Sequence, residues 1–170
     1  MFKNTSYFWL ALALIVVEIF ILDQLSIAMW LRPMIFPLII ILLPMEWRTI
    51  WVLMVALVVG IVMDMSLGGA GLYTATLLPL AVVRSSVMYL TTRRGVEPGD
   101  QTPLLSRIAM RQMMIFVGAM LLIHHALFFS LEAMSVALLW QLVATIVMST
   151  LLSLVIAWPI VRLFISKIVR

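Results

Sequence analysis

Three long stretches of this 170-residue chain contain no Asp, Glu, Lys or Arg, and they constrain its fold more than any other feature. They are residues 65–83, 112–131 and 133–161, which are 19, 20 and 29 residues long. About 20 apolar residues are needed to cross a bilayer as an α-helix. The composition agrees, because 65% of the residues are hydrophobic and 11% are charged, whereas soluble domains are about 45–50% apolar and about 25% charged. The sequence therefore predicts an integral membrane protein that lies mostly in the bilayer.

Hydropathy divides the chain into six apolar segments, which we interpret as six transmembrane helices of one all-α domain over residues 1–170. The second segment is the least regular, because Arg32, Pro33 and Pro37 interrupt it and proline removes a backbone donor. Its regular helix is expected only over residues 34–44. The predicted spans are, in chain order, about residues 7–22, 26–44, 47–64, 72–90, 112–131 and 136–165.

The positions of Lys and Arg predict the orientation, because cytoplasmic flanks retain positive charge during insertion. Six spans that start inside place nine of the 11 basic residues on the cytoplasmic side and only Arg32 outside. Arg84 is about 9 Å of helix from Leu90, so its side chain is expected to reach the cytoplasmic headgroups. Both termini and the loop 91–111 are therefore predicted to be cytoplasmic. A five-span alternative, with a re-entrant second segment, would break this bias. The nine residues are Lys3, Arg48, Arg93, Arg94, Arg107, Arg111, Arg162, Lys167 and Arg170.

The common residue patterns of active sites are missing from the sequence. It has no H-E-x-x-H metal motif, no G-x-S-x-G serine motif and no cysteine. The only histidines, His124 and His125, are adjacent, so on a helix they point about 100° apart and cannot share a metal as an i, i+4 pair could. We interpret them as polar contacts near the outer end of the fifth span, with a lone ligand or a proton-titrating role as the alternative. No enzymatic activity, cofactor or bound metal is expected.

The net charge of +4 does not need a nucleic-acid partner to explain it, and no such partner is expected. Basic loops at the inner face are attracted to anionic lipid by about 1 kcal/mol per residue. The lipid bilayer is therefore a sufficient partner for these charges.

Four acidic residues gather toward the outer side: Glu18, Asp23, Asp64 and Glu132. Because a carboxylate that faces lipid is costly, Glu18 and Asp64 are expected to face the bundle or a wet cavity and to be paired or protonated. Asp23 and Glu132 are interpreted as solvated at the interface, and solvation there is also the alternative for Asp64. Asp64 has two expected partners: the backbone N–H groups at the start of the fourth helix, where the helix dipole favours negative charge, or Arg32 across the bundle.

The sixth segment carries a stripe of small or hydrogen-bonding residues at a spacing of four. In lipid, such residues allow close backbone approach and hydrogen bonds between helices. Packing inside the bundle is the favoured interpretation, and contact with another membrane protein is the alternative. A proline farther along, Pro159, is expected to kink or end this helix. The stripe consists of Ala137, Gln141, Thr145, Ser149, Ser153 and Ala157.

The stretch from Leu31 to Arg84 resembles the MreD family of bacterial rod-shape proteins. The Arg32-Pro33 pair opens a short apolar segment that Pro44 closes, and a later span ends in G-x-x-x-D, at Gly60 and Asp64, followed four residues later by Gly68. Gly60 permits close helix approach, and Gly68 permits a positive φ where the chain reverses.

The resemblance implies a non-enzymatic scaffold in the bacterial inner membrane. MreD-like proteins lie beside the periplasmic scaffold MreC, which links MreB filaments inside the cell to the peptidoglycan glycosyltransferase and transpeptidase outside. The motif residues Arg32, Pro33, Gly60, Asp64 and Gly68 would then organise a partner-binding structure.

A second hypothesis comes from a different class. The MreD family is similar in architecture to the substrate-binding subunits of energy-coupling-factor vitamin transporters, which also have six helices. Those subunits carry an A-x-x-x-A pattern on the first helix, and the first span here lacks it. A substrate-capture subunit is therefore the alternative to a scaffold.

Overall fold

The computed structural model describes residues 3–22, 31–93, 108–133 and 139–169. Every regular element in these ranges is a helix. The elements are α1 (Lys3–Val17), the π-helix η1 (Glu18–Leu22), α2 (Leu38–Ile41), α3 (Thr49–Leu67), α4 (Leu72–Thr92), α5 (Met110–Ala133) and α6 (Leu139–Val169).

Four helices are long and apolar enough to cross a membrane: α3, α4, α5 and the Leu139–Ser166 part of α6. The expected all-α fold is thus confirmed in the described residues, and these four helices are compatible with the expected membrane protein. A shorter apolar helix, Tyr7–Leu22, covers the first predicted span. The helices extend beyond several predicted bounds, and α6 does not end at Pro159 but continues through it to Val169.

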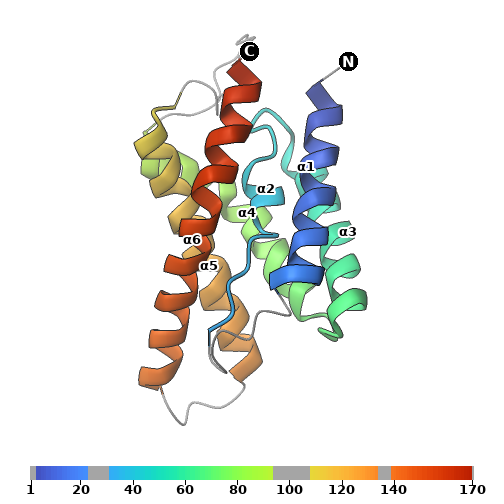
Figure 1. Ribbon diagram of the computed structural model, residues 1–170, viewed down its shortest axis with the longest axis vertical. Helices are drawn as coiled ribbons and strands as arrows, with labels where there is room; N and C mark the ends of the chain where they lie inside the picture. Colours follow the sequence, from blue (N-terminus) through green and yellow to red (C-terminus); the bar gives the residue numbers. More distant parts are fainter. Residues whose placement is uncertain (1–2, 23–30, 94–107, 134–138, 170) are drawn as a thin grey trace.

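The long helices pack in sequence order, α3 on α4, α4 on α5 and α5 on α6. Helix α1 packs on α2, and η1 packs on α3. Figure 1 shows that α1 begins and α6 ends at the same end of the molecule, which we name the terminal end. The turn between α3 and α4 lies at the opposite end, named the turn end. Short α2 lies in the middle of the bundle, and all four of its residues are buried.

The second predicted span is largely not a helix. Residues 31–37 run as irregular chain through the interior, and only Leu38–Ile41 form α2. The expected helix over 34–44 is therefore wrong in extent. Proline explains the difference, because Pro33 and Pro37 lack an N–H group and each also disfavours helical backbone in the residue before it. Residues 26–30 of the predicted span lie outside the described residues.

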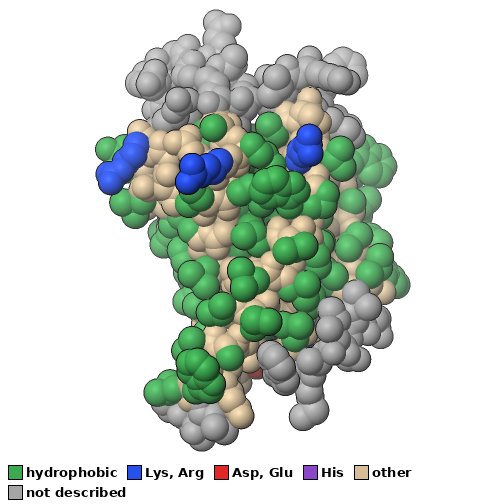
Figure 2. Space-filling view, turned by 60° about the vertical axis from the view of Figure 1, so that its left-hand side comes forward, with side chains coloured by type: hydrophobic (Ala, Val, Ile, Leu, Met, Phe, Trp, Pro, Cys, Tyr) green, Lys and Arg blue, Asp and Glu red, His purple; other side chains and the backbone are tan. Residues whose placement is uncertain are grey.

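The exposed surface agrees with a membrane environment. Exposed large apolar side chains occur on α1, α3, α4, α5 and α6. On the face seen in Figure 2, basic side chains gather near the terminal end and apolar side chains cover the region below them. Among the described residues, Arg48, Arg93, Arg111 and Arg162 are exposed. The first three lie at ends of α3, α4 and α5, and Arg162 lies in the last third of α6.

Candidate functional site

A buried polar network surrounds the irregular segment 31–37. Backbone inside a membrane protein must find its hydrogen-bond partners within the protein, and non-helical backbone survives at that depth only where protein surrounds it. In this chain side chains of η1 and α6 provide such partners, and a side chain of α4 serves the residues that follow the segment. The network contains residues that the sequence singled out and residues that it did not.

Glu18 supplies the first of these partners. It opens η1 and is only 3% exposed. Its Oε2 accepts hydrogen bonds from the backbone N–H groups of Ile35, at 2.8 Å, and Phe36, at 3.1 Å. The prediction that Glu18 faces the bundle interior is confirmed. The π-helical turn changes the direction of side chains relative to α1, and such turns are frequent at functional positions.

Two serines of α6 supply the next partners. Ser153 Oγ accepts from the Met34 N–H at 2.9 Å, and Ser149 Oγ accepts from the Arg32 N–H at 3.3 Å. Both serines are fully buried, and Thr145 and Ala157 of the same stripe are also buried. Packing inside the bundle is therefore the correct interpretation for these four residues. The remaining stripe residues differ, because Gln141 is exposed and Ala137 lies outside the described residues.

The adjacent histidines are both completely buried. His125 Nδ1 lies 2.7 Å from the carbonyl oxygen of Leu121, so we assign the ring proton to Nδ1. His125 Nε2 then accepts from the Ser153 hydroxyl at 3.3 Å. His124 Nε2 lies 3.4 Å from Thr76 Oγ1. The interpretation as polar contacts is thus the one that agrees with the structure.

The two histidine rings differ in how many of their nitrogens have a hydrogen-bond partner. His124 Nδ1 has no hydrogen-bond partner among the described residues. Its ring instead packs edge-on against Phe36, at a centroid distance of 5.1 Å, and against His125 at 5.7 Å. No group of three or more His, Asp or Glu side chains that could hold a metal occurs in the described ranges.

Arg84 is the residue that the sequence interpretation placed wrongly. It does not extend to the headgroups but is 3% exposed inside the bundle. Its guanidinium donates to the carbonyl oxygens of Ile40 at 3.1 Å and of Leu43 and Pro44, each at 2.8 Å. The Ile40 carbonyl belongs to the short helix α2, and the other two carbonyls follow α2 in the chain. Carbonyl groups at the C-terminus of a helix lack intrahelical partners. Arg84 therefore holds the chain where α2 ends, beyond the irregular segment.

Asp64 organises the turn end between α3 and α4. Its Oδ1 accepts from the Tyr73 N–H at 3.0 Å, and its Oδ2 accepts from the Thr74 N–H at 3.0 Å and the Thr74 hydroxyl at 2.6 Å. Tyr73 and Thr74 are in the first turn of α4, where N–H groups lack intrahelical partners. The expected capping of the fourth helix by Asp64 is confirmed.

Two motif glycines take the roles expected of them. Gly68 ends α3 with φ +71°, in the left-handed region that favours glycine. A Cβ added at Gly60 would lie 2.6 Å from the Cα of Thr74, so α3 and α4 approach closely there. Gly60, Asp64 and Gly68 thus build one tight hairpin.

Arg32 pairs with a different acid from the one considered in the sequence. Its Nη1 lies 2.9 Å from Glu132 Oε1, and its guanidinium lies 5.8 Å from the centre of the Phe128 ring. No contact with Asp64 is formed, so the Asp64–Arg32 alternative is wrong. Glu132, expected to be only solvated, joins segment 31–37 to the end of α5. Pro33 is buried beside Arg32, and Asp23 lies outside the described residues.

An open groove adjoins the Asp64 turn. It has a volume of about 540 Å³. The lining side chains are mostly small, which would let another backbone approach closely. They belong to Ile61, Asp64, Met65, Ala70, Gly71, Thr74 and Ala75.

Comparison with known proteins yields no relative. No protein-family model matches the chain, and no curated protein or solved structure is similar to it. The structure defines a helical protein suited to a membrane.

Proposed function

We propose that this protein is a non-enzymatic scaffold of the bacterial cell-elongation complex, in the inner membrane, and that it binds an MreC-like partner. The observation that carries the proposal is how the motif residues Gly60, Asp64 and Gly68 are used. They form one capped hairpin beside an open groove. The Asp64 carboxylate therefore has a structural role, since it accepts hydrogen bonds from backbone N–H groups and from a hydroxyl group.

The rest of the buried network supports the same conclusion. Glu18, Arg84, Ser149 and Ser153 all hydrogen-bond to the backbone of residues 32–44. In membrane proteins, hydrogen bonds of this kind help hold a bundle together. We propose that the turn end, with the Arg32–Glu132 pair and the Asp64 hairpin, faces the periplasm and meets the partner.

The proposed topology has six crossings with both termini inside, and the irregular segment 31–37 with α2 forms the second crossing. We expect an alkaline phosphatase domain fused after Arg170, or inserted at Gly99, to be inactive, because it would stay in the cytoplasm. A fusion in the turn between α3 and α4, at Ala70, should be active and serves as the positive control. High activity at Arg170 or at Gly99 would contradict six crossings.

The partner is tested by affinity purification in a mild detergent. We expect an MreC-like protein to co-purify, and depletion in a rod-shaped host to produce rounded cells. Recovery of ABC-type ATPase subunits in place of the MreC-like protein would instead favour the substrate-capture alternative. Normal cell width after depletion, in rich and in poor medium, would contradict a role in elongation.

A substitution series at Asp64 tests the capping role. Asp64→Ala removes three acceptor contacts and is expected to cost about 2 kcal/mol or more of stability, since capping and charge-assisted hydrogen bonds each contribute about 1–2 kcal/mol. Asp64→Asn keeps the Tyr73 contact but turns an NH₂ group toward the Thr74 N–H, so we expect an intermediate loss. The measurement is the thermal unfolding midpoint in detergent.

The matched control for this series is Ser66→Ala, because Ser66 is exposed on the same turn of α3. It should unfold at the wild-type temperature. If Asp64→Ala also unfolded at that temperature and kept the partner, the hairpin would not depend on this carboxylate.

A further inference from the structure

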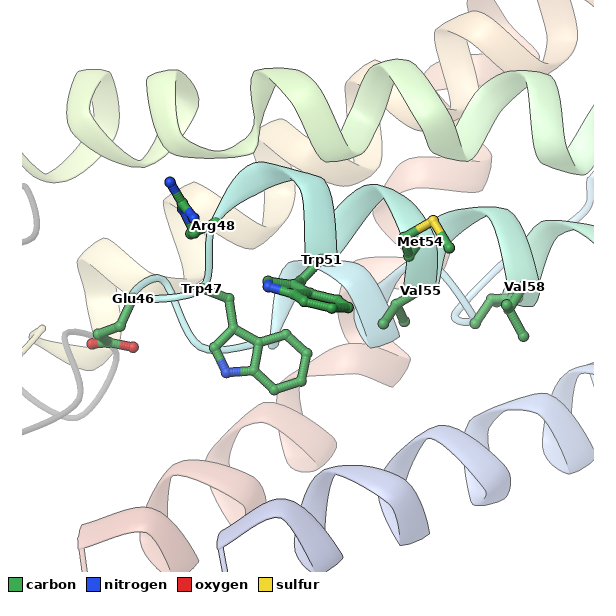
Figure 3. Close-up of a pocket in the computed structure, with 8 residues that line it drawn as sticks. Glu46, Trp47, Arg48, Trp51, Met54, Val55 and Val58 are labelled. Atoms are coloured by element: carbon green, nitrogen blue, oxygen red, sulfur yellow. The ribbon is translucent and has the colours of Figure 1, made fainter.

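A second open groove runs along the outer face of α3, away from the Asp64 hairpin. Its volume is about 710 Å³, which is in the range of small-molecule sites, about 300–1,000 Å³. Figure 3 shows Trp51, Val55 and Val58 following one another along α3, with Glu46, Trp47 and Arg48 in the chain just before it. Met54 and Val59 complete the lining.

The groove continues toward α1. A neighbouring pocket of about 250 Å³ shares Trp47 and Val55 with it and is lined on the other side by Tyr7, Phe8, Leu10 and Ala11 of α1. Ile39 and Leu43 line the same pocket from the α2 region. Together the two cavities form an apolar cleft between α1 and α3, which we name the α1–α3 cleft.

Polarity changes in one direction along this cleft. The charged residues Glu46 and Arg48 lie at the terminal end, two indole rings follow, and only aliphatic and thioether side chains lie beyond Trp51. Tryptophan is enriched where the headgroup region meets the hydrocarbon core, and its N–H seeks a polar partner there. The order of the side chains therefore matches the order of groups in a phospholipid: headgroup, ester region, acyl chain.

The length of the cleft distinguishes a lipid from a partner helix. From Arg48 to Val58 is ten residues of helix, or about 15 Å at 1.5 Å per residue. The hydrocarbon core of a bilayer is about 30 Å thick. The groove thus covers about one leaflet, which fits a lipid, whereas a transmembrane helix packed on α3 would require a groove of the full depth.

We propose that the α1–α3 cleft binds one glycerophospholipid of the leaflet at the terminal end, with an acyl chain between α1 and α3. Arg48 provides the positive charge for the phosphate group, and the Trp47 and Trp51 indoles lie at the ester region. Glu46, which lines the same groove, favours a headgroup that carries an ammonium as well as a phosphate. The ligand is therefore of the phosphatidylethanolamine type.

The test measures lipid that stays with the purified protein. The protein is reconstituted in vesicles of equal parts phosphatidylethanolamine and phosphatidylglycerol, extracted in mild detergent and analysed by native mass spectrometry. We expect about one bound phosphatidylethanolamine per chain. Arg48→Gln should weaken retention about tenfold, the loss expected for one charge-assisted hydrogen bond, and Val58→Trp should abolish it by filling the groove.

Matched controls use the same changes elsewhere on the lipid-facing surface. Arg162→Gln and Val155→Trp alter exposed residues of α6 outside the cleft and should retain lipid as the wild type does. Val58 is also exposed, so its replacement should leave the fold intact, which a thermal unfolding midpoint checks. Equal retention in cleft variants and controls would overturn the proposal. Preferential retention of phosphatidylglycerol, or a photo-crosslinker at Val58 that captures a protein helix and no lipid, would also overturn it.

Discussion

Arg84→Ala is expected to destabilise the protein more than any other single change in the described chain. The substitution removes the side-chain donors to the carbonyl groups of Ile40, Leu43 and Pro44. The Pro44 carbonyl keeps the Trp47 N–H at 3.3 Å, so the loss falls mainly on the carbonyls of the buried residues Ile40 and Leu43. Each buried carbonyl left unpaired costs about 1–3 kcal/mol. We expect a total loss of roughly 3–5 kcal/mol, at the upper end of what point mutations cause, measured as the thermal unfolding midpoint in detergent.

Arg84→Lys keeps the positive charge but removes the planar guanidinium, so it tests which of the two stabilises the protein. An ammonium is a compact point charge and cannot span three carbonyls as the planar guanidinium does, so lysine should restore only part of the stability. The control is Arg93→Ala, because Arg93 is exposed at the C-cap of the same helix. If Arg84→Ala and Arg93→Ala unfolded at the same temperature, the chain at the end of α2 would not depend on Arg84.

The membrane class and the Asp64 hairpin were predictable because both depend on short-range information. An uncharged run of 20 residues is read directly from the sequence. In the hairpin, Gly60, Asp64, Gly68 and the capped residue Thr74 lie within 15 consecutive positions, so a spacing rule and the chemistry of helix ends suffice. The prolines of segment 31–37 likewise signalled a break in the second helix.

The network around segment 31–37 was not predictable in the same way. The Met34 N–H bonds to Ser153, 119 positions away, and Arg84 bonds to Ile40, 44 positions away. Periodicity shows which residues share a helix face, but not which neighbouring chain that face meets. One signal was present for Arg84, since it ends an uncharged run of 19 residues, and an ionisable residue at such a depth usually faces protein rather than lipid.

Arg32 shows the same difference between local and distant information. The sequence placed it on the outer side as the lone basic residue there and offered Asp64 as its partner. Its partner Glu132 lies 100 positions away at the end of α5. Spacing along the chain does not show that segment 31–37 runs past the end of α5, and it is this path that brings Arg32 to Glu132.

Glu18→Ala is the second substitution with a large expected effect. Oε2 of this buried carboxylate accepts two consecutive backbone N–H groups, those of Ile35 and Phe36, and alanine would leave both unpaired inside the bundle. At about 1–3 kcal/mol for each group, we expect a loss of roughly 2–5 kcal/mol. Because the effect is local to two amides, hydrogen exchange at Ile35 and Phe36 should accelerate along with the fall in the unfolding temperature.

Glu18→Gln distinguishes the hydrogen bonds from the charge. The amide oxygen of glutamine has two lone pairs and can accept both N–H groups, so the irregular segment should stay protected from exchange, with a stability loss of about 1 kcal/mol from the weaker, uncharged acceptor. Val16→Ala, an exposed change one half-turn away on α1, controls for general loosening of that helix. Unchanged exchange at Ile35 and Phe36 in Glu18→Ala would mean that α6, through Ser149 and Ser153, holds the segment by itself. If instead the amides are exposed in Glu18→Ala and protected in Glu18→Gln, the irregular segment depends on an oxygen acceptor in the π-turn, which explains why a carboxylate is tolerated inside the bundle.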